Sequence, residues 1–144
     1  MSTSFRKRVA VVFTAAVLMT GSALTIGAGP ASAGPAATFE AGALQSDGSR
    51  TIVIKTGGTT AGTIKWTANG DTLTATDSKA DGHGVSGYIN TVNPYLIANT
   101  AGHSSPYTDT AHRDLPENQG ELLFACIGNN SDGLTCSGNY NIAT

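Results

Sequence analysis

The stretch AGTIKWTANGDTLTATD, residues 61–77, decides the fold because it predicts a β-hairpin. Two alternating runs flank Asn69-Gly70, the strongest two-residue hairpin signal, since both central positions of a type I′ turn need a positive φ. Placing the turn there fixes the register of the two strands. The predicted facing pairs are Ala68 with Asp71, Thr67 with Thr72, Trp66 with Leu73, Lys65 with Thr74, and Ile64 with Ala75.

This register gives the hairpin two unlike faces. The apolar face carries Ile64, Trp66, Leu73 and Ala75, and the polar face carries Thr63, Lys65, Thr67, Thr72, Thr74 and Thr76. A slip of one residue would put Trp66 in water, so the pattern protects its own register. We expect Trp66 in the core, with an exposed, sugar-stacking tryptophan as the alternative. The threonine ridge has some similarity to an ice-binding surface, but a solvated sheet face is the default.

The C-terminal stretch ELLFACIGNNSDGLTCSGNYNIAT, residues 121–144, predicts a second strand pair around NNSDG. If Cys126 faces Cys136, then Phe124 faces Gly138 and Leu122 faces Tyr140. One face then collects Leu122, Phe124, Cys126, Cys136, Tyr140 and Ile142. The two cysteines of an exported chain predict one disulfide, Cys126–Cys136, which contributes roughly 2–3 kcal/mol by closing a short loop.

Further strands are expected in residues 37–45, 50–56, 84–92 and 95–98, where short alternating runs lie between turn residues. No stretch keeps a helical period over three turns. The chain therefore predicts an all-β domain, a small antiparallel two-sheet β-sandwich of about seven or eight strands with one disulfide. A small closed barrel is the second choice.

The N-terminus predicts a signal peptide, residues 1–33, followed by the sandwich domain, residues 34–144. Arg6, Lys7 and Arg8 precede an apolar run that leads to Ala31-Ser32-Ala33, a small-residue cleavage pattern. An uncleaved anchor and a nucleic-acid patch are the weaker alternatives. Beyond residue 33, five Lys and Arg residues stand against ten Asp and Glu residues, a net charge of −5. We therefore expect a secreted, extracellular protein with no nucleic-acid partner and no membrane attachment after cleavage.

Residues 99–120, NTAGHSSPYTDTAHRDLPENQG, show no period and are expected to form a long loop. Long loops without regular structure are uncommon in small domains and are often functional. A floppy connection is the plain alternative. The candidate binding residues of this loop are His103, Tyr107, Asp109, His112, Arg113 and Asp114.

Catalytic and metal-binding motifs are missing from the sequence. It contains no G-x-S-x-G, no H-E-x-x-H, no C-x-x-C and no phosphate-binding loop. We therefore expect no enzyme, no catalytic residue, no metal and no cofactor. Two metal sites remain as alternatives: His83, His103 and His112 with Asp109 or Asp114 for zinc or copper, and Asp77 with Asp81 for calcium.

The run WTANGDTLTATDSKADGHGV, residues 66–85, resembles a set of small secreted actinobacterial proteins. They carry a similar W…GD-x-L/F-x-x-x-D-x-K-A-D-G-x-G-V segment and a C-terminal two-cysteine strand pair. The similarity covers residues 61–92 closely and the C-terminal pair loosely. The resemblance implies that the chain is an exported β-sandwich. It says less about activity, since most of these proteins are uncharacterised. Some small exported proteins of these bacteria are subunits of secreted particles, toxin particles included, and others inhibit hydrolases. The resemblance assigns no functional residue to this chain.

Together these features predict a small secreted, non-enzymatic protein that recognises another extracellular protein, as an inhibitor or as an adaptor subunit of a secreted particle. It would bind through residues 99–120 or through a strand edge. The first alternative is a lectin-like carbohydrate-binding module with Tyr88, Tyr95 or Tyr107 as sugar platforms. The further alternative is a secreted hydrolase or metal-binding protein that uses His103 and His112.

Overall fold

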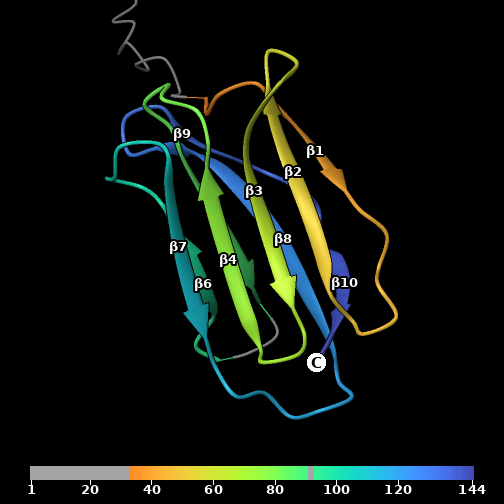
Figure 1. Ribbon diagram of the computed structural model, residues 1–144. Helices are drawn as coiled ribbons and strands as arrows, with labels where there is room; N and C mark the ends of the chain where they lie inside the picture. The colour runs from red at the N-terminus through yellow and green to blue at the C-terminus, as the bar shows by residue number, and fades with distance from the viewer. Residues whose placement is uncertain (1–32, 91–92) are drawn as a thin grey trace, which may run out of the picture. The chain divides into compact units, whose positions relative to one another are not determined.

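The computed structural model describes residues 33–90 and 93–144, and within these ranges the chain is all β with no helix. The predicted signal peptide lies outside them except for its last residue. Ten strands form two antiparallel sheets, so the predicted sandwich is confirmed with more strands than expected (Figure 1). Sheet A has the order β1-β2-β3-β4-β7, and sheet B has the order β10-β8-β5-β6 with β9 also on β8.

The strands of sheet A are β1 (Ala37–Ala41), β2 (Arg50–Thr56), β3 (Thr59–Thr67), β4 (Thr72–Asp77) and β7 (Tyr107–His112). Those of sheet B are β5 (Gly84–Ile89), β6 (Leu96–Asn99), β8 (Gly120–Asn129), β9 (Gly133–Cys136) and β10 (Tyr140–Ala143).

The hairpin of β3 and β4 has the predicted register, from Ile64 opposite Ala75 to Thr67 opposite Thr72. The predicted type I′ turn is wrong, because the positive φ angles fall on Gly70 (93°) and Asp71 (42°) and not on Asn69. The Asp71 N–H still donates to the Ala68 carbonyl over 3.1 Å. The predicted register is correct all the same, because it depends only on which residues the turn joins. The turn type depends on the φ angles of those residues.

The core fills the space between the two sheets. Trp66 is fully buried, as expected, and its Nε1 donates to the Ala143 carbonyl of β10 over 2.8 Å, which ties sheet A to sheet B. At Gly87 of β5 the sheets approach closely, because a Cβ there would collide with Ile64 and lie 3.3 Å from Leu73 Cδ1. Alternate residues of both sheets therefore share one apolar core.

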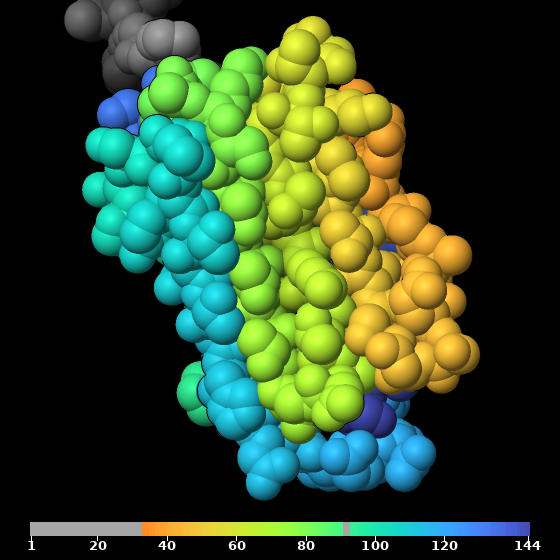
Figure 2. Space-filling view, viewed as in Figure 1, coloured from red at the N-terminus to blue at the C-terminus, as the bar shows by residue number. Residues whose placement is uncertain are grey.

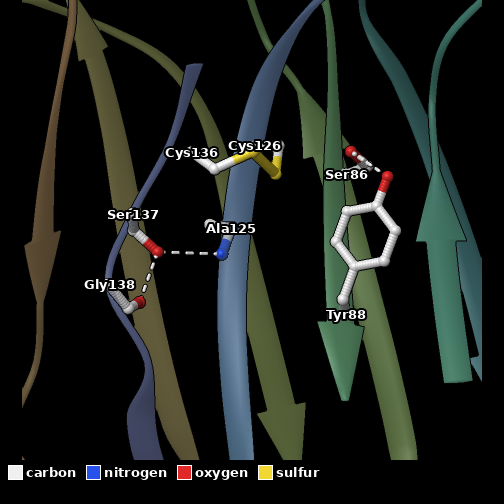
Figure 3. Close-up of a disulfide and its surroundings, with 7 residues drawn as sticks. All are labelled: Ser86, Tyr88, Ala125, Cys126, Cys136, Ser137 and Gly138. Carbon is white, nitrogen blue, oxygen red and sulfur yellow. Dashed lines mark hydrogen bonds between the residues drawn. A yellow bond between two sulfur atoms is a disulfide. The ribbon is translucent and has the colours of Figure 1, made fainter. Parts of the chain in front are cut away.

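The C-terminal register is correct at the disulfide and wrong beyond it. Cys126 lies opposite Cys136 and bonds to it, but Tyr140 pairs with Leu123 and not with Leu122. The Ser137 side chain causes this one-residue shift, because its Oγ accepts from Ala125 N over 3.0 Å where a ladder residue would lie (Figure 3). Such a bulge moves the following residues to the other face.

Two face assignments change as a result. Tyr140 and Ile142 share the inner side with Leu123, so they do not lie beside Phe124 as predicted. No heavy atom lies within 4 Å of a Cβ built on Gly138, so Phe124 does not cover that glycine.

The segment 99–120 is not one irregular loop, because its middle forms β7, an edge strand paired with β4. The sequence of β7 does not show the apolar–polar alternation of a strand because Asp109 occupies an inner position, opposite Ala75. Asp109 Oδ2 accepts from Asn99 N of β6 over 2.8 Å, so the carboxylate joins the two sheets at their edge. An apolar alternation rule overlooks an inner aspartate of this kind.

Candidate functional site

The outer face of sheet A is a polar surface of threonines and charged groups. Lys55 Nζ lies 2.7 Å from Glu40 Oε1 across β2 and β1, and Lys65 is exposed on β3. Figure 2 shows β2, β3, β4 and β7 covering this side of the molecule. The outward threonines of β3, β4 and β7 are Thr63, Thr67, Thr72, Thr74, Thr76, Thr108 and Thr110.

The outer face of sheet B has the opposite character. Its five strands contain a single Asp, Glu, Lys or Arg, which is Glu121. Glu121 is only 7% exposed, and it faces the interior of the sandwich together with Leu123 and Ala125 of β8. The outer side of these strands therefore carries no charged side chain.

Apolar side chains cross the middle of this face as a row of three: Ile97 on β6, Tyr88 on β5 and Phe124 on β8 lie directly opposite one another. The rings of Tyr88 and Phe124 stack with centroids 4.7 Å apart and planes within 8°. Ile97 is 43% exposed, Leu134 on β9 is 56% exposed, and Tyr95, just before β6, is 55% exposed. We call these five residues the sheet B patch.

The disulfide and the Tyr88 hydroxyl hold this face in place (Figure 3). Cys126 and Cys136 link β8 to β9 in the row next to Phe124. The Ser86 hydroxyl donates to the Tyr88 hydroxyl over 3.2 Å, which directs that ring along β5. Four of the five patch residues lie on paired strands and Tyr95 directly precedes β6, so most of these side chains are positioned before any partner arrives.

The structure brings together only two of the six predicted loop residues. His103 and Tyr107 stack with ring centroids 3.9 Å apart. His112 ends β7, five residues after Tyr107, so roughly 17 Å of extended strand separates it from that pair. The His103–His112 pair needed for a metal or hydrolase site is therefore not formed.

The remaining loop residues have structural contacts or lie apart. Arg113 Nη1 donates to the Pro94 carbonyl over 2.6 Å, and its backbone N–H donates to the Asp71 carbonyl over 3.3 Å. Asp114 is exposed. Within residues 33–90 and 93–144, no three His, Cys, Asp or Glu side chains are grouped to hold a metal ion.

The three tyrosines considered as sugar platforms differ in what their rings contact. Tyr88 stacks on Phe124 and Tyr107 stacks on His103, so each has one ring face covered. A sugar platform needs an open ring face directed at solvent. Tyr95, at 55% exposure, has no ring stacked on it in the described part of the chain.

A cavity of about 630 Å³ opens at one end of the sandwich, where three connections meet. They follow β4, β6 and β8, and they contribute Lys79, His83, His103 and Ser105 to its wall. Lys79 is not among the candidate residues that the sequence suggests, and His83 is among them only as a zinc or copper ligand. Only the convergence of three loops from distant positions creates the cavity, and no local pattern indicates it.

One buried carboxyl is electrostatically unusual. Burial raises the pKa of Glu121 above its ordinary value of 4.5, and its buried Oε2 has no hydrogen-bond partner in the described structure. Desolvation is the cause, since burial disfavours the ionised form.

Comparison of the chain with protein-family models, curated proteins and solved structures finds no match. Among the residues described, no helix is long and apolar enough to cross a membrane.

Proposed function

We propose that this chain is a secreted, non-enzymatic binding protein that docks another extracellular protein on the sheet B patch, as an inhibitor or as an adaptor subunit of a larger particle. One observation carries the proposal: a row of apolar side chains crosses an outer sheet face that has no charged residue. The centres of protein interfaces are depleted in charge and enriched in aromatic residues in this way.

The charge distribution indicates the chemistry of the partner. Residues 34–144 carry a net charge of −5, yet none of that charge lies on the outer side of the sheet B strands. A partner that covers the patch should therefore present an uncharged, apolar centre. Acidic groups elsewhere on the surface would discourage two copies from approaching each other, which favours a different protein over a second copy.

The ring geometry favours a protein over a carbohydrate. Tyr88 and Phe124 contact each other through their faces at 4.7 Å. Rings stacked at this distance across neighbouring strands cannot both lie flat on the sheet, so they offer edges and apolar flanks to a partner. Apolar side chains of a protein pack against such a surface better than the flat face of a sugar does.

The area of the face fits the centre of an interface. Four strands spaced by about 4.8 Å and some six residues long give roughly 300–400 Å². A stable complex usually buries about 800 Å² on each partner. The patch would then supply the dry centre, and the surrounding loops would supply the rim.

The extracellular location agrees with the disulfide Cys126–Cys136, because such bonds persist mainly in oxidising compartments. The predicted signal peptide supports the same location.

The test is affinity capture from culture fluid with two matched variants. Ile97→Asp places a charge on edge strand β6 of sheet B, and Thr110→Asp places the same charge on edge strand β7 of sheet A. We expect wild type and Thr110→Asp to retain one identified protein, and Ile97→Asp to bind the purified partner at least about tenfold more weakly.

Three outcomes would overturn the proposal. The first is equal loss of the partner in both variants. The second is capture that Ile97→Asp leaves unchanged. The third is a wild-type protein that retains only a glycan or a second copy of itself, as judged by mass spectrometry and sedimentation. Unchanged circular dichroism of both variants is the control for folding.

A further inference from the structure

We propose that the end cavity is a second binding site, separate from the sheet B patch, and that it takes one organic cation, a guanidinium or a primary ammonium group. The inference does not depend on the proposed docking function. The site is supported by its hydrogen-bonded loops, the open Asp77 oxygen, the local charge and the exposed His103 ring.

Hydrogen bonds hold two of the three loops together. Asn129 Nδ2 donates to the Gly82 carbonyl over 3.1 Å, and Asn129 Oδ1 accepts from the N–H groups of Ser131 and Asp132 at 2.9 and 2.7 Å. His83 lies between two carboxylates, with Nδ1 3.3 Å from Asp81 and Nε2 3.4 Å from Asp132. These two sides of the wall are thus held in place before any ligand binds, which lowers the entropic cost of binding.

Asp77 is the central acceptor of the cavity. It ends β4 at an inner position of the sheet, is only 3% exposed, and still lines the cavity. Its Oδ1 accepts from Lys79 N over 3.0 Å, while no donor of the described chain reaches Oδ2. Oδ2 is not among the buried atoms that lack a partner, so it is open to the solvent of the cavity, where a ligand that donates to it replaces water.

Ser105 adds a second unpartnered atom. Its hydroxyl oxygen is buried on the cavity wall and has no hydrogen-bond partner within the described residues. The wall therefore offers the open Asp77 oxygen to a ligand with several N–H donors, as guanidinium and ammonium groups have, while the buried Ser105 oxygen is reached only after a shift of its loop.

The charge near the cavity selects a cation. Asp77, Asp81 and Asp132 stand against one lysine, so the carboxylates and the lysine near the cavity sum to a charge of −2. That lysine does not neutralise Asp77, because its Nζ is engaged 2.7 Å from Thr56 Oγ1 and 3.5 Å from Asp81 Oδ2. An anion would be repelled, and the described side chains form no metal-binding group.

The His103 ring supplies a flat surface at the rim. It is exposed, lines the cavity and is held by its stack on Tyr107 at 3.9 Å. Guanidinium groups stack on such rings. A cavity of about 630 Å³ lies within the usual range for small ligands, so it holds a cationic head with part of its aliphatic stem.

The experiment is an amide NMR titration of the purified protein. The probes are Nα-acetyl-arginine methylamide, Nα-acetyl-lysine methylamide and the uncharged Nα-acetyl-citrulline methylamide, which matches arginine in shape. We expect shifts at the three loops with the cationic probes and affinity at least about tenfold lower for the citrulline probe. Agmatine distinguishes the source: tighter binding of the blocked arginine assigns a protein side chain, and tighter binding of agmatine assigns a free amine.

Two variants test the assigned groups. Asp77→Asn keeps the shape and should weaken cation binding at least about tenfold, whereas Glu40→Gln removes the same charge on β1 and should not. Should Asp77→Asn unfold, His103→Ala on the exposed rim should weaken the arginine probe more than the lysine probe. Ile97→Asp should bind all probes normally, which keeps this test independent of the docking proposal. Equal binding of the citrulline and arginine probes, or wild-type affinity in Asp77→Asn, would refute the site.

Discussion

The two sheets pack against one shared core, but their outer faces differ in polarity and charge. Sheet A presents threonines with the Lys55–Glu40 ion pair, while sheet B presents Ile97, Tyr88 and Phe124 without a charge. The polar face is what a solvated sheet requires, and the apolar face is not. Features that folding alone does not explain tend to mark function, so this contrast is the reason for proposing sheet B as the docking side.

The largest effect on stability should come from the covalent link in sheet B. Replacing Cys126 and Cys136 with Ala opens a loop of sequence separation 10, which should lower the free energy of unfolding by about 2–3 kcal/mol. Urea denaturation measures the loss. Hydrogen exchange should show that β8 and β9 lose protection before the β3–β4 hairpin of sheet A does. Equal loss of hydrogen-exchange protection in both sheets would show that the disulfide does not act locally.

Gly87→Ala tests how closely sheet B approaches sheet A. The added Cβ would collide with Ile64 and lie 3.3 Å from Leu73 Cδ1, so overpacking should cost about 1–3 kcal/mol in chemical denaturation. Gly138→Ala is the matched control in the same sheet region, because its Cβ would meet no heavy atom within 4 Å. Similar losses in the two variants would contradict the close contact between the sheets.

The smallest effect should come from Glu121, the one charged residue of the sheet B strands. Its pKa is raised by burial, so the folded state holds the proton more tightly than the unfolded state does. The stability of the wild type therefore falls as the pH rises from the ordinary pKa through the raised one. Glu121→Gln should be more stable by about 1 kcal/mol or less near neutral pH.

The same variant should show no advantage at about pH 3, where the carboxyl is protonated in both states. Calorimetry across this pH range tests the sign. A variant that is less stable than wild type near neutral pH would mean that the ionised carboxylate has a favourable partner.

The sequence predicts the β3–β4 hairpin well because its information is local. Asn69-Gly70 marks the turn, and the alternation around Trp66 fixes the faces. The pairing at Cys126–Cys136 was equally predictable. The register beyond it was not, because a single hydroxyl, that of Ser137, takes a ladder position and shifts the next strand by one residue.

The candidate sites were harder to predict for the same physical reason. Strand β7 was missed because Asp109 takes an inner position to hold β6. The sheet B patch needs the order β8-β5-β6, in which Phe124 pairs with Tyr88, 36 positions before it. The cavity needs three turns to meet at one end of the sandwich. Local patterns report faces and turns, but they do not report which strands become neighbours.

The most direct test of the docking face is site-specific photo-crosslinking in culture fluid. A benzophenone side chain would replace Ile97 on sheet B in one sample and Thr110 on sheet A in another. The docking account predicts that position 97 crosslinks to one other extracellular protein and that position 110 gives no specific product. Crosslinking of the same protein from position 110 but not from position 97 would contradict it.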